Sequence, residues 1–569
     1  MRYINEKKDL KLYAVAGTQT VLLSFDIAKA KLDNKDFIGF SVERKDKAGK
    51  IIFLNGTKHF PSLANAADEK IRTRSFVQSF YWQDYTADPD ETYVYTVKTM
   101  FGPAANPTSN FESSIKVTTE KLHDGKHSVF FNYGVTGSQA YAKNFHNLPP
   151  DQLSAKEKVK ALALLGRDLW SEGLQKFVQA ATDNTYSIFG AFYEFQQIDF
   201  LNELKAAKKR GVDVQLVVSG KADQYDDRVD KRSGIKKLGN GTMIKKAGLA
   251  SCVKSLRTKP SQPHNKFMIL CKNGKPVQVW TGSTNITMAG IFGQCNTGHW
   301  VVDDSMAAKY MQYWNGLIGD PVMGAMAKIS EGISEDGDLI KLPKGDYVFF
   351  SPRDRGTTAI PSVHLQNYAK LIDNADELVC MVFPFNMDDV FSKVYGKNKK
   401  YLRLLIFESA SDAANVKSND TDLKVTAGNV YKGKEQGFIS EITAKTTTGA
   451  GILYVHNKFF ILDALTDHPV VMSGSANFSN NSIRNNDENS LVIKGNMRVA
   501  DIYLTEFDRL FTHFWPRYLA SLNIKNKTPQ GFAKPLDETG TWHKDYFDPT
   551  RFAAKRKILF QNMFGGKQG

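Results

Sequence analysis

The sequence predicts an α/β fold: two α/β repeats packed as a pseudo-dimer, preceded by an all-β sandwich domain. The repeats are predicted because the octapeptide HNKFMILC (residues 264–271) recurs almost unchanged as HNKFFILD (residues 456–463), 192 residues later. Each copy also follows the same order of strands and helices. The sandwich is predicted because the first 120 residues contain short β-rich runs with no helical period between them.

The N-terminal domain, residues 1–125, is expected to be built from short strands. Its β-rich runs lie at 20–27, 37–46, 50–56, 92–102 and 113–120. Several short strands without an intervening helix are typical of a sandwich. The run YVYTV and the strand after it resemble a fibronectin type III or immunoglobulin-like domain. Because this region offers no catalytic group, we expect it to serve as a docking domain or as a spacer. Its ligand would be a protein or a polymer.

Residues 126–158 are expected to connect the sandwich to the repeats. They end in NLPPDQLSAKEK, which combines two prolines with a Ser-x-x-Glu helix start at Ser154–Glu157. The first repeat, 159–335, then runs from an apolar strand (185–195) through an amphipathic helix (198–211) to another strand (212–220). A helix this short between two strands implies a right-handed parallel crossover.

The second repeat, 336–520, shows the same order. A helix is expected over 362–375, a strand over 377–385, a short helix over 387–396 and a strand over 400–409. Residues 521–569 are expected to form a C-terminal extension whose segment 542–560 packs back onto the catalytic core.

Composition narrows the class of protein. The formal net charge is +15 and the sequence pI is about 9.2, which suits a polyanionic partner and equally an ordinary basic globular protein. The polar N-terminus and the lack of a long apolar run predict a cytoplasmic protein, with peripheral membrane contact left open. The cysteines are scattered, which argues against a structural zinc site; they are Cys252, Cys271, Cys295 and Cys380.

Both repeats carry H-x-K followed by G-S-x-N, with 19 residues from His to Ser (264 to 283 and 456 to 475). Because residues i and i+2 of a strand project from one face, each His and its Lys point the same way. Lys, Asn and Ser can bind the oxygens of a phosphoryl group, and the imidazole can attack phosphorus or move a proton. A phosphodiester needs two proton-handling groups on opposite sides of phosphorus, which is a reason to carry the motif twice. The two sets are His264, Lys266, Ser283, Asn285 and His456, Lys458, Ser475, Asn477.

At these residues the sequence resembles the phospholipase D superfamily, whose signature is H-x-K-x4-D followed by G-S-x-N, in two copies. The resemblance covers about residues 155–520. It implies two α/β repeats in one unit, with the active site at their interface and no metal or other cofactor. It also implies a phosphodiesterase that works in two steps through a covalent phosphohistidine.

The first motif departs from this signature at Cys271, where the family has an aspartate; the second motif keeps Asp463. This position faces away from the His–Lys face of the strand, and its role in the family looks structural. We therefore expect Cys271 to be a packing substitution, with a degenerate first half-site as the alternative.

The repeats also differ at a position that the family commonly fills with a carboxylate bonded to the catalytic imidazole. Glu488 lies 11 residues past the Asn of the second G-S-x-N, and Asn296 lies 11 residues past that of the first. We expect Glu488 beside His456 and Asn296 beside His264. Since a carboxylate favours imidazolium, this pairing predicts His264 as the nucleophile and His456 as the general acid and then base.

The substrate class is not fixed by the motif, and three functions stay open. A nuclease is favoured by KSLRTKPSQPHNK, which places Lys254, Arg257 and Lys259 before His264, where they could follow a phosphate backbone. A phospholipase D would also suit a basic surface. A catalytically silent binding protein is the third alternative. Hydrolysis versus transfer, the leaving group and the oligomeric state are also open.

Overall fold

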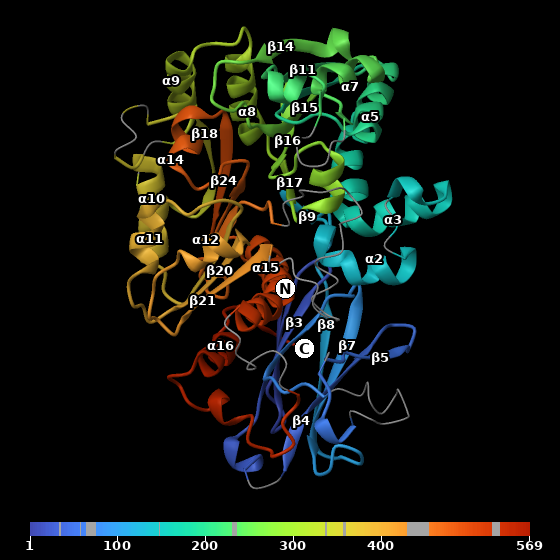
Figure 1. The fold of residues 1–569 in the computed structure, drawn as a ribbon, viewed down its shortest axis with the longest axis vertical. Helices are drawn as coiled ribbons and strands as arrows, with labels where there is room; N and C mark the ends of the chain where they lie inside the picture. Colours follow the sequence, from blue (N-terminus) through green and yellow to red (C-terminus); the bar gives the residue numbers. More distant parts are fainter. Residues whose placement is uncertain are drawn as a thin grey trace.

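A computed structural model describes residues 1–33, 36–56, 58–63, 76–146, 148, 150–229, 236–335, 338–354, 356, 360–429, 455–525 and 535–569. An all-β region lies at one end of the longest axis, and two α/β repeats lie side by side at the other (Figure 1). The predicted fold class is confirmed.

Two sheets form the all-β region. One has the strand order β25 (Lys567–Gln568), β1 (Arg2–Asn5), β2 (Lys11–Ala16), β3 (Val21–Asp26) and β6 (Tyr81–Asp84). The other has the order β5 (Ile51–Phe53), β4 (Phe37–Lys45), β7 (Thr92–Phe101) and β8 (Thr108–Thr118). Buried and half-buried residues alternate strictly along β7, as expected for a strand with one face in a core. That core includes Phe25, Phe40 and Tyr95.

The first repeat is built on a seven-stranded mixed sheet. Its strand order is β14 (Val253–Arg257), β11 (Asp213–Ser219), β10 (Tyr186–Phe192), β15 (Lys266–Lys272), β16 (Lys275–Gly282), β17 (Thr297–Val302) and β9 (His127–Phe131). Strands β10 and β11 run parallel on either side of α5 (Ile198–Lys209) in the chain, so the predicted parallel crossover is present.

The second repeat has an equivalent sheet. Its order is β21 (Leu423–Asn429), β20 (Leu402–Ser409), β19 (Leu378–Phe383), β22 (Phe459–Leu462), β23 (Val470–Gly474), β24 (Glu488–Lys494) and β18 (Gly345–Ser351). In this comparison β9 is the counterpart of β18, because each closes the outer edge of its sheet. Residues 127–131 therefore belong to the first sheet, whereas the sequence placed them in a connecting segment.

Helices cover the faces of both sheets. In the first repeat they include α2 (Ser138–Phe145), α3 (Ala155–Asp168), α7 (Asn240–Ala247), α8 (Asp304–Leu317) and α9 (Met323–Ile333). In the second they include α10 (Val363–Asp373), α11 (Asp389–Tyr395), α12 (Ala410–Ala414), α14 (Asn480–Asn485) and α15 (Met497–Lys525). The predicted start of α3 is confirmed, since Ser154 and Glu157 form a reciprocal capping box. Among the residues that the structure describes, no helix combines the length and the hydropathy that crossing a bilayer requires.

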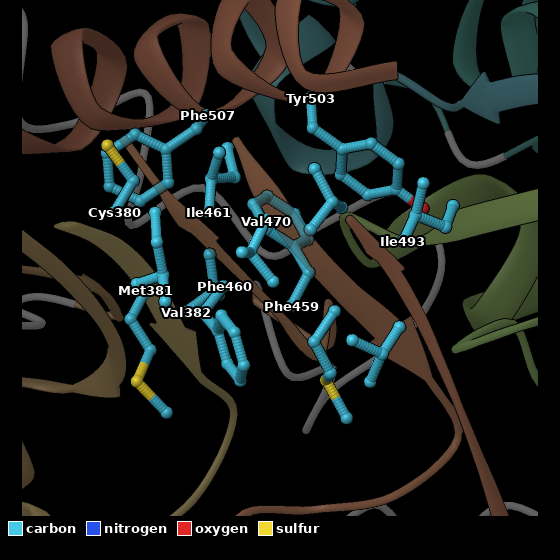
Figure 2. Packing of buried hydrophobic residues seen from close by; sticks show 14 of the residues in the cluster. Cys380, Met381, Val382, Phe459, Phe460, Ile461, Val470, Ile493, Tyr503 and Phe507 are labelled. Carbon is cyan, nitrogen blue, oxygen red and sulfur yellow. The ribbon is translucent and has the colours of Figure 1, made fainter. Parts of the chain in front are cut away.

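Helix α15 ties the second repeat to its neighbours. Figure 2 shows Tyr503 and Phe507 of this helix pointing onto the second sheet, where both rings meet Phe459 at centroid distances of 5.2 and 6.3 Å. Helix α15 also contacts β9 and β2. One hydrophobic cluster consequently spans both repeats and reaches the sandwich.

The C-terminal extension packs against the sandwich and also against the second repeat, where Lys555 pairs with Asp422 and Arg556 with Asp508, so the expected docking onto the catalytic core is one part of its contacts. The Trp542 indole donates to the Phe37 carbonyl at 3.0 Å, and the Tyr546 ring lies 4.9 Å from that of Phe80. Helix α16 (Phe552–Gln561) then brings Phe560 into the cluster shared with the repeats. Aromatic residues are the cause, because the sandwich leaves Phe37 and Phe80 to be covered.

Candidate active site

The predicted His–Lys–Ser–Asn sets lie at matching ends of the central strands in the two sheets. Lys266 is the first residue of β15, and Lys458 directly precedes β22. Ser283 and Ser475 directly follow β16 and β23. Both histidines and both lysines are at most 4% exposed. The two motifs of each repeat therefore meet at the same end of neighbouring central strands.

The glycine of each G-S-x-N allows the chain to approach the next strand closely. A Cβ atom on Gly282 would lie 2.2 Å from the Thr297 carbonyl oxygen, and one on Gly474 would lie 2.3 Å from that of Asn489. The following serine amides donate to these same two carbonyls at 3.0 Å. A larger residue at either glycine would push the serine away from the site.

Each histidine is held by a residue of the other repeat. His264 Nδ1 lies 2.8 Å from Glu488 Oε2, and His456 Nδ1 lies 3.1 Å from Asn296 Oδ1. The predicted pairing within each repeat is therefore wrong. The repeats face each other, so the residue 11 positions past each Asn reaches across the interface to the opposite ring.

Hydrogen bonds around Asn296 fix the tautomer of His456. The Asn296 amide donates from Nδ2 to the Gly290 carbonyl at 2.8 Å, so its Oδ1 must accept. Ser283 donates to that oxygen at 2.8 Å, and His456 Nδ1 is therefore the second donor. The Nε2 atom of His456 is left available for a proton or a substrate.

Glu488 fixes His264 in the same way. Its Oε1 accepts from Ser482 Oγ at 2.9 Å and from Asn486 Nδ2 at 3.1 Å, while its Oε2 faces His264 Nδ1. Burial raises the pKa of Glu488, but the neighbouring His264 and Lys266 outweigh it and hold the pKa below its usual value. The carboxylate is therefore ionised, and His264 presents Nε2 to the pocket.

The two lysines are anchored identically. Lys266 Nζ donates to the His264 carbonyl at 2.7 Å, and Lys458 Nζ donates to the His456 carbonyl at 2.8 Å. An aromatic ring lies near each ammonium: Tyr193 at 5.4 Å from Lys266 Nζ and Phe385 at 5.9 Å from Lys458 Nζ. Burial lowers the pKa of both lysines, and a bound anion would favour their charged ammonium forms.

The pKa values show how closely these groups interact. Burial lowers the pKa of His264 to about 4 and that of Lys266 to about 7. Burial also places the pKa of His456 well below its usual value, and Lys458, Lys266 and His264 lower it further. Because residues of both repeats act on one imidazole, the two half-sites form a single site.

Asp463 and Cys271 behave as structural positions. Asp463 Oδ1 accepts from the backbone amides of Asp376, Glu377 and Leu378 at 3.1, 2.8 and 3.1 Å. Cys271 is buried in the hydrophobic core, and burial raises its pKa to about 12. Asp463 and the nearby His468 also lie within 4.8 Å of a third possible metal ligand, Asp376, but the Asp463 oxygens are occupied by these backbone amides.

The basic segment before His264 divides into two parts. Lys254 and Lys259 are exposed. Arg257 is only 1% exposed: its Nε lies 2.7 Å from Asp487 Oδ2 and its Nη1 lies 2.8 Å from Asp320 Oδ1. The expectation that Arg257 follows a phosphate backbone is therefore wrong, because two carboxylates hold its guanidinium inside the protein.

One polar residue of the site was missed from the sequence. The Glu194 carboxylate accepts a hydrogen bond from Asn285 Nδ2 at 2.5 Å. Burial raises the pKa of Glu194, and Lys266, Arg228 and Lys237 oppose that shift. Its position two residues past β10, at the end of the sheet where the other site residues lie, was a signal that could have found it.

Comparisons with known proteins agree with this site. The family model described as "Cardiolipin synthase, PLD-like domain" matches residues 176–318 and 397–511. The human mitochondrial cardiolipin hydrolase is 32% identical over 95 residues, which are 16% of this chain and 35% of that protein. The chain therefore spans about a third of the length of this curated relative.

Solved structures give weaker likenesses. Phosphatidylserine synthase from Haemophilus influenzae is 12% identical, with 74% of this chain and 99% of that one covered and a TM-score of 0.40. The phospholipase D family member Nuc from Salmonella typhimurium is 25% identical, with 25% and 82% covered and a TM-score of 0.19. Yeast tyrosyl-DNA phosphodiesterase is 12% identical, with 56% and 84% covered and a TM-score of 0.29. At these TM-scores the likenesses carry no functional argument.

The matched PLD-like model covers both copies of the H-x-K and G-S-x-N motifs, and the histidines of the two copies are held by residues of the opposite repeat. In both motifs and in the matched PLD-like regions, the chain is similar to the phospholipase D superfamily.

Proposed function

We propose that the protein is a metal-independent phosphodiesterase that cleaves its substrate through a covalent phosphohistidine. The observation that carries the proposal is the crosswise contact of each histidine with the opposite repeat. Two imidazoles and two ammonium groups are thereby gathered around one anion-binding pocket, which matches the needs of a phosphodiester.

Lys266 and Lys458 bind the non-bridging oxygens of the phosphate, with Asn285 and Asn477 as neutral donors. Each ammonium keeps one hydrogen bond to a backbone carbonyl, which leaves its remaining N–H groups for the substrate. Charge that moves onto these oxygens in the transition state is stabilised by donors already in place.

His264 acts as the nucleophile. With a pKa of about 4 it is neutral near pH 7, as a nucleophile must be. Its Nε2 forms a bond to phosphorus while the bond to the leaving oxygen breaks. The ring becomes positively charged in the phosphohistidine, and Glu488 at 2.8 Å compensates that charge. The predicted nucleophile is thus kept, with a different reason for it.

His456 acts as the general acid and then as the general base. The bound phosphate anion raises the pKa of this buried ring, so that Nε2 carries a proton for the leaving oxygen. In the second step Nε2 takes a proton from water, whose oxygen attacks phosphorus and releases His264. Asn296 holds the ring in the required tautomer throughout.

Nucleic acid is the substrate class that we propose first. The net charge of +15 and the exposed Lys254 and Lys259 near His264 support it. Phospholipid is the second candidate, because the matched family model and the human relative are both named for cardiolipin. Both classes offer the same singly charged diester to the pocket.

The test is to offer the purified protein plasmid, single-stranded DNA, RNA and liposomes of phosphatidylcholine or cardiolipin, all in excess EDTA. We expect one class to be cleaved, with His264→Ala and His456→Ala both inactive. Cleavage that EDTA abolishes, or that survives in both variants, would contradict the mechanism. Binding without turnover of any diester would favour a silent binding protein.

A further inference from the structure

The two half-sites differ in charge at one matching position. Tyr193 and Phe385 are equivalent, because each ring lies near the lysine of its own repeat. The next residue is Glu194 in the first repeat and Asn386 in the second. Glu194 is half-buried, whereas Asn386 is exposed. At this pair of matching positions, therefore, only the first repeat carries a carboxylate.

Glu194 contacts the groups that bind phosphate. Its carboxylate accepts from Asn285 Nδ2 and is close enough to Lys266 for each to shift the pKa of the other. Arg228 on β12 (Arg228–Val229) and Lys237 on β13 (Lys236–Lys237) are the other cations that act on it. The carboxylate thus offsets part of the positive charge that an anion would meet beside Asn285.

A carboxylate at this place affects singly and doubly charged ligands differently. A phosphodiester brings one negative charge, which Lys266 and Lys458 can neutralise once the bound anion has raised their lowered pKa values. A phosphomonoester brings nearly two at neutral pH, and its additional charge would lie near Glu194 as well as near the lysines. Repulsion between like charges grows with the ligand's charge, and it is stronger in a half-buried site than in water.

We propose that Glu194 restricts the pocket to singly charged diesters by disfavouring a second negative charge on the bound group. The inference rests on the proposed function, since it names what the same pocket rejects. Glu194 contacts Asn285 directly. It affects which anion binds through electrostatic repulsion of the bound group, and it takes part in no step of the reaction. Release of a monoester product would be favoured for the same reason.

The test compares two tetrahedral anions that differ in charge, sulfate with two negative charges and methyl sulfate with one. Binding is measured by calorimetry near pH 7.5 for the native protein and for Glu194→Gln, which keeps the size of the side chain. We expect Glu194→Gln to bind sulfate about tenfold more tightly and methyl sulfate less than about threefold more tightly. Glu172→Gln, which removes an outlying carboxylate paired with Lys176, is the matched control and should change neither.

An equal change for both anions would overturn the inference, because Glu194 would then only order Asn285. No change for sulfate would overturn it as well. If Glu194→Gln unfolds, the native protein decides alone: it should bind methyl sulfate at least as tightly as sulfate, and a tenfold preference for sulfate contradicts the proposal. Because binding needs no turnover, failure to cleave any diester would count against the proposed function only.

Discussion

The two half-sites keep the same His, Lys, Ser and Asn groups and differ in the residues that hold their histidines. His, Lys, Ser and Asn occupy equivalent places in both repeats, at the same ends of equivalent strands. The first histidine has a carboxylate partner, Glu488, and the second has an amide, Asn296. Since both partners come from the opposite repeat, neither repeat contains a complete site, and the duplication can give its two imidazoles different roles.

The aromatic neighbours extend this difference to the mouth of the pocket. Tyr193 is half-buried and accepts a hydrogen bond from Gln224 at 3.1 Å, whereas Phe385 is 43% exposed. The first half-site is therefore the more enclosed and polar one. The second has a more exposed aromatic neighbour, Phe385.

Substitutions of Glu488 and Asn296, the partners of the two histidines, should show the largest difference in kcat between the half-sites. Glu488→Gln removes the charge that stabilises the phosphohistidine, so we expect kcat to fall about 100-fold. Asn296→Ala removes only a neutral partner and should cost about tenfold. Both are measured on the cleaved diester, with thermal unfolding as the control for folding. A larger loss for Asn296→Ala would reverse the assignment of the two rings.

The pH profile tests whether the lysines bind the diester as cations. Lys266, with a pKa of about 7, is protonated below pH 7 and loses its charge above it. We expect kcat/KM to fall as pH rises through about 7, by up to tenfold for each pH unit. The fall in kcat should come at higher pH, because the bound anion raises the lysine pKa. A flat profile between pH 6 and 9 would contradict this.

Substitutions at Asp463 and at the equivalent Cys271 should lower the free energy of unfolding for different reasons. Asp463→Ala leaves three backbone amides without their acceptor and should cost about 2–3 kcal/mol of unfolding free energy. Cys271→Asp buries a carboxylate in an apolar core and should cost about 3 kcal/mol or more. Denaturant unfolding measures both, and Cys271→Val is the control that should cost less than about 1.5 kcal/mol. If Cys271→Asp left the unfolding free energy unchanged, the first repeat would tolerate an aspartate at the position that Asp463 occupies in the second.

The smallest expected effect concerns the exposed lysines near His264. If nucleic acid is the substrate, Lys254→Ala together with Lys259→Ala should reduce the slope of log affinity against log salt by about two. Arg257→Met should leave that slope unchanged, because this guanidinium is bound to Asp487 and Asp320, and should instead lower stability. An unchanged slope in the double variant would favour the phospholipid alternative.

The fold class and the eight residues of the two motifs could be predicted because both depend on local order along the chain. Spacing within a repeat fixes which end of a strand a residue occupies. It does not fix which histidine Glu488 reaches, since that depends on how the repeats pack. Arg257 was misjudged for a similar reason: its partners Asp320 and Asp487 lie 63 and 230 residues away along the chain.

Strand β9 shows the same limit at the level of the fold. The segment HSVFF follows the sandwich and precedes the prolines, so it reads as a connection. Its pairing partner, β17, lies about 170 residues further on, and only the need to close the edge of the first sheet identifies it. Glu194 was passed over because a single carboxylate after a strand has no motif of its own.

The most direct test of the account is to find which histidine carries the phosphate. The His456→Ala and His264→Ala variants are each mixed with a diester substrate, quenched, and examined by peptide mass spectrometry under conditions that preserve phosphohistidine. The proposed mechanism predicts a stable adduct on His264 in His456→Ala and none in His264→Ala. An adduct on His456 in His264→Ala, with none in the other variant, would contradict it.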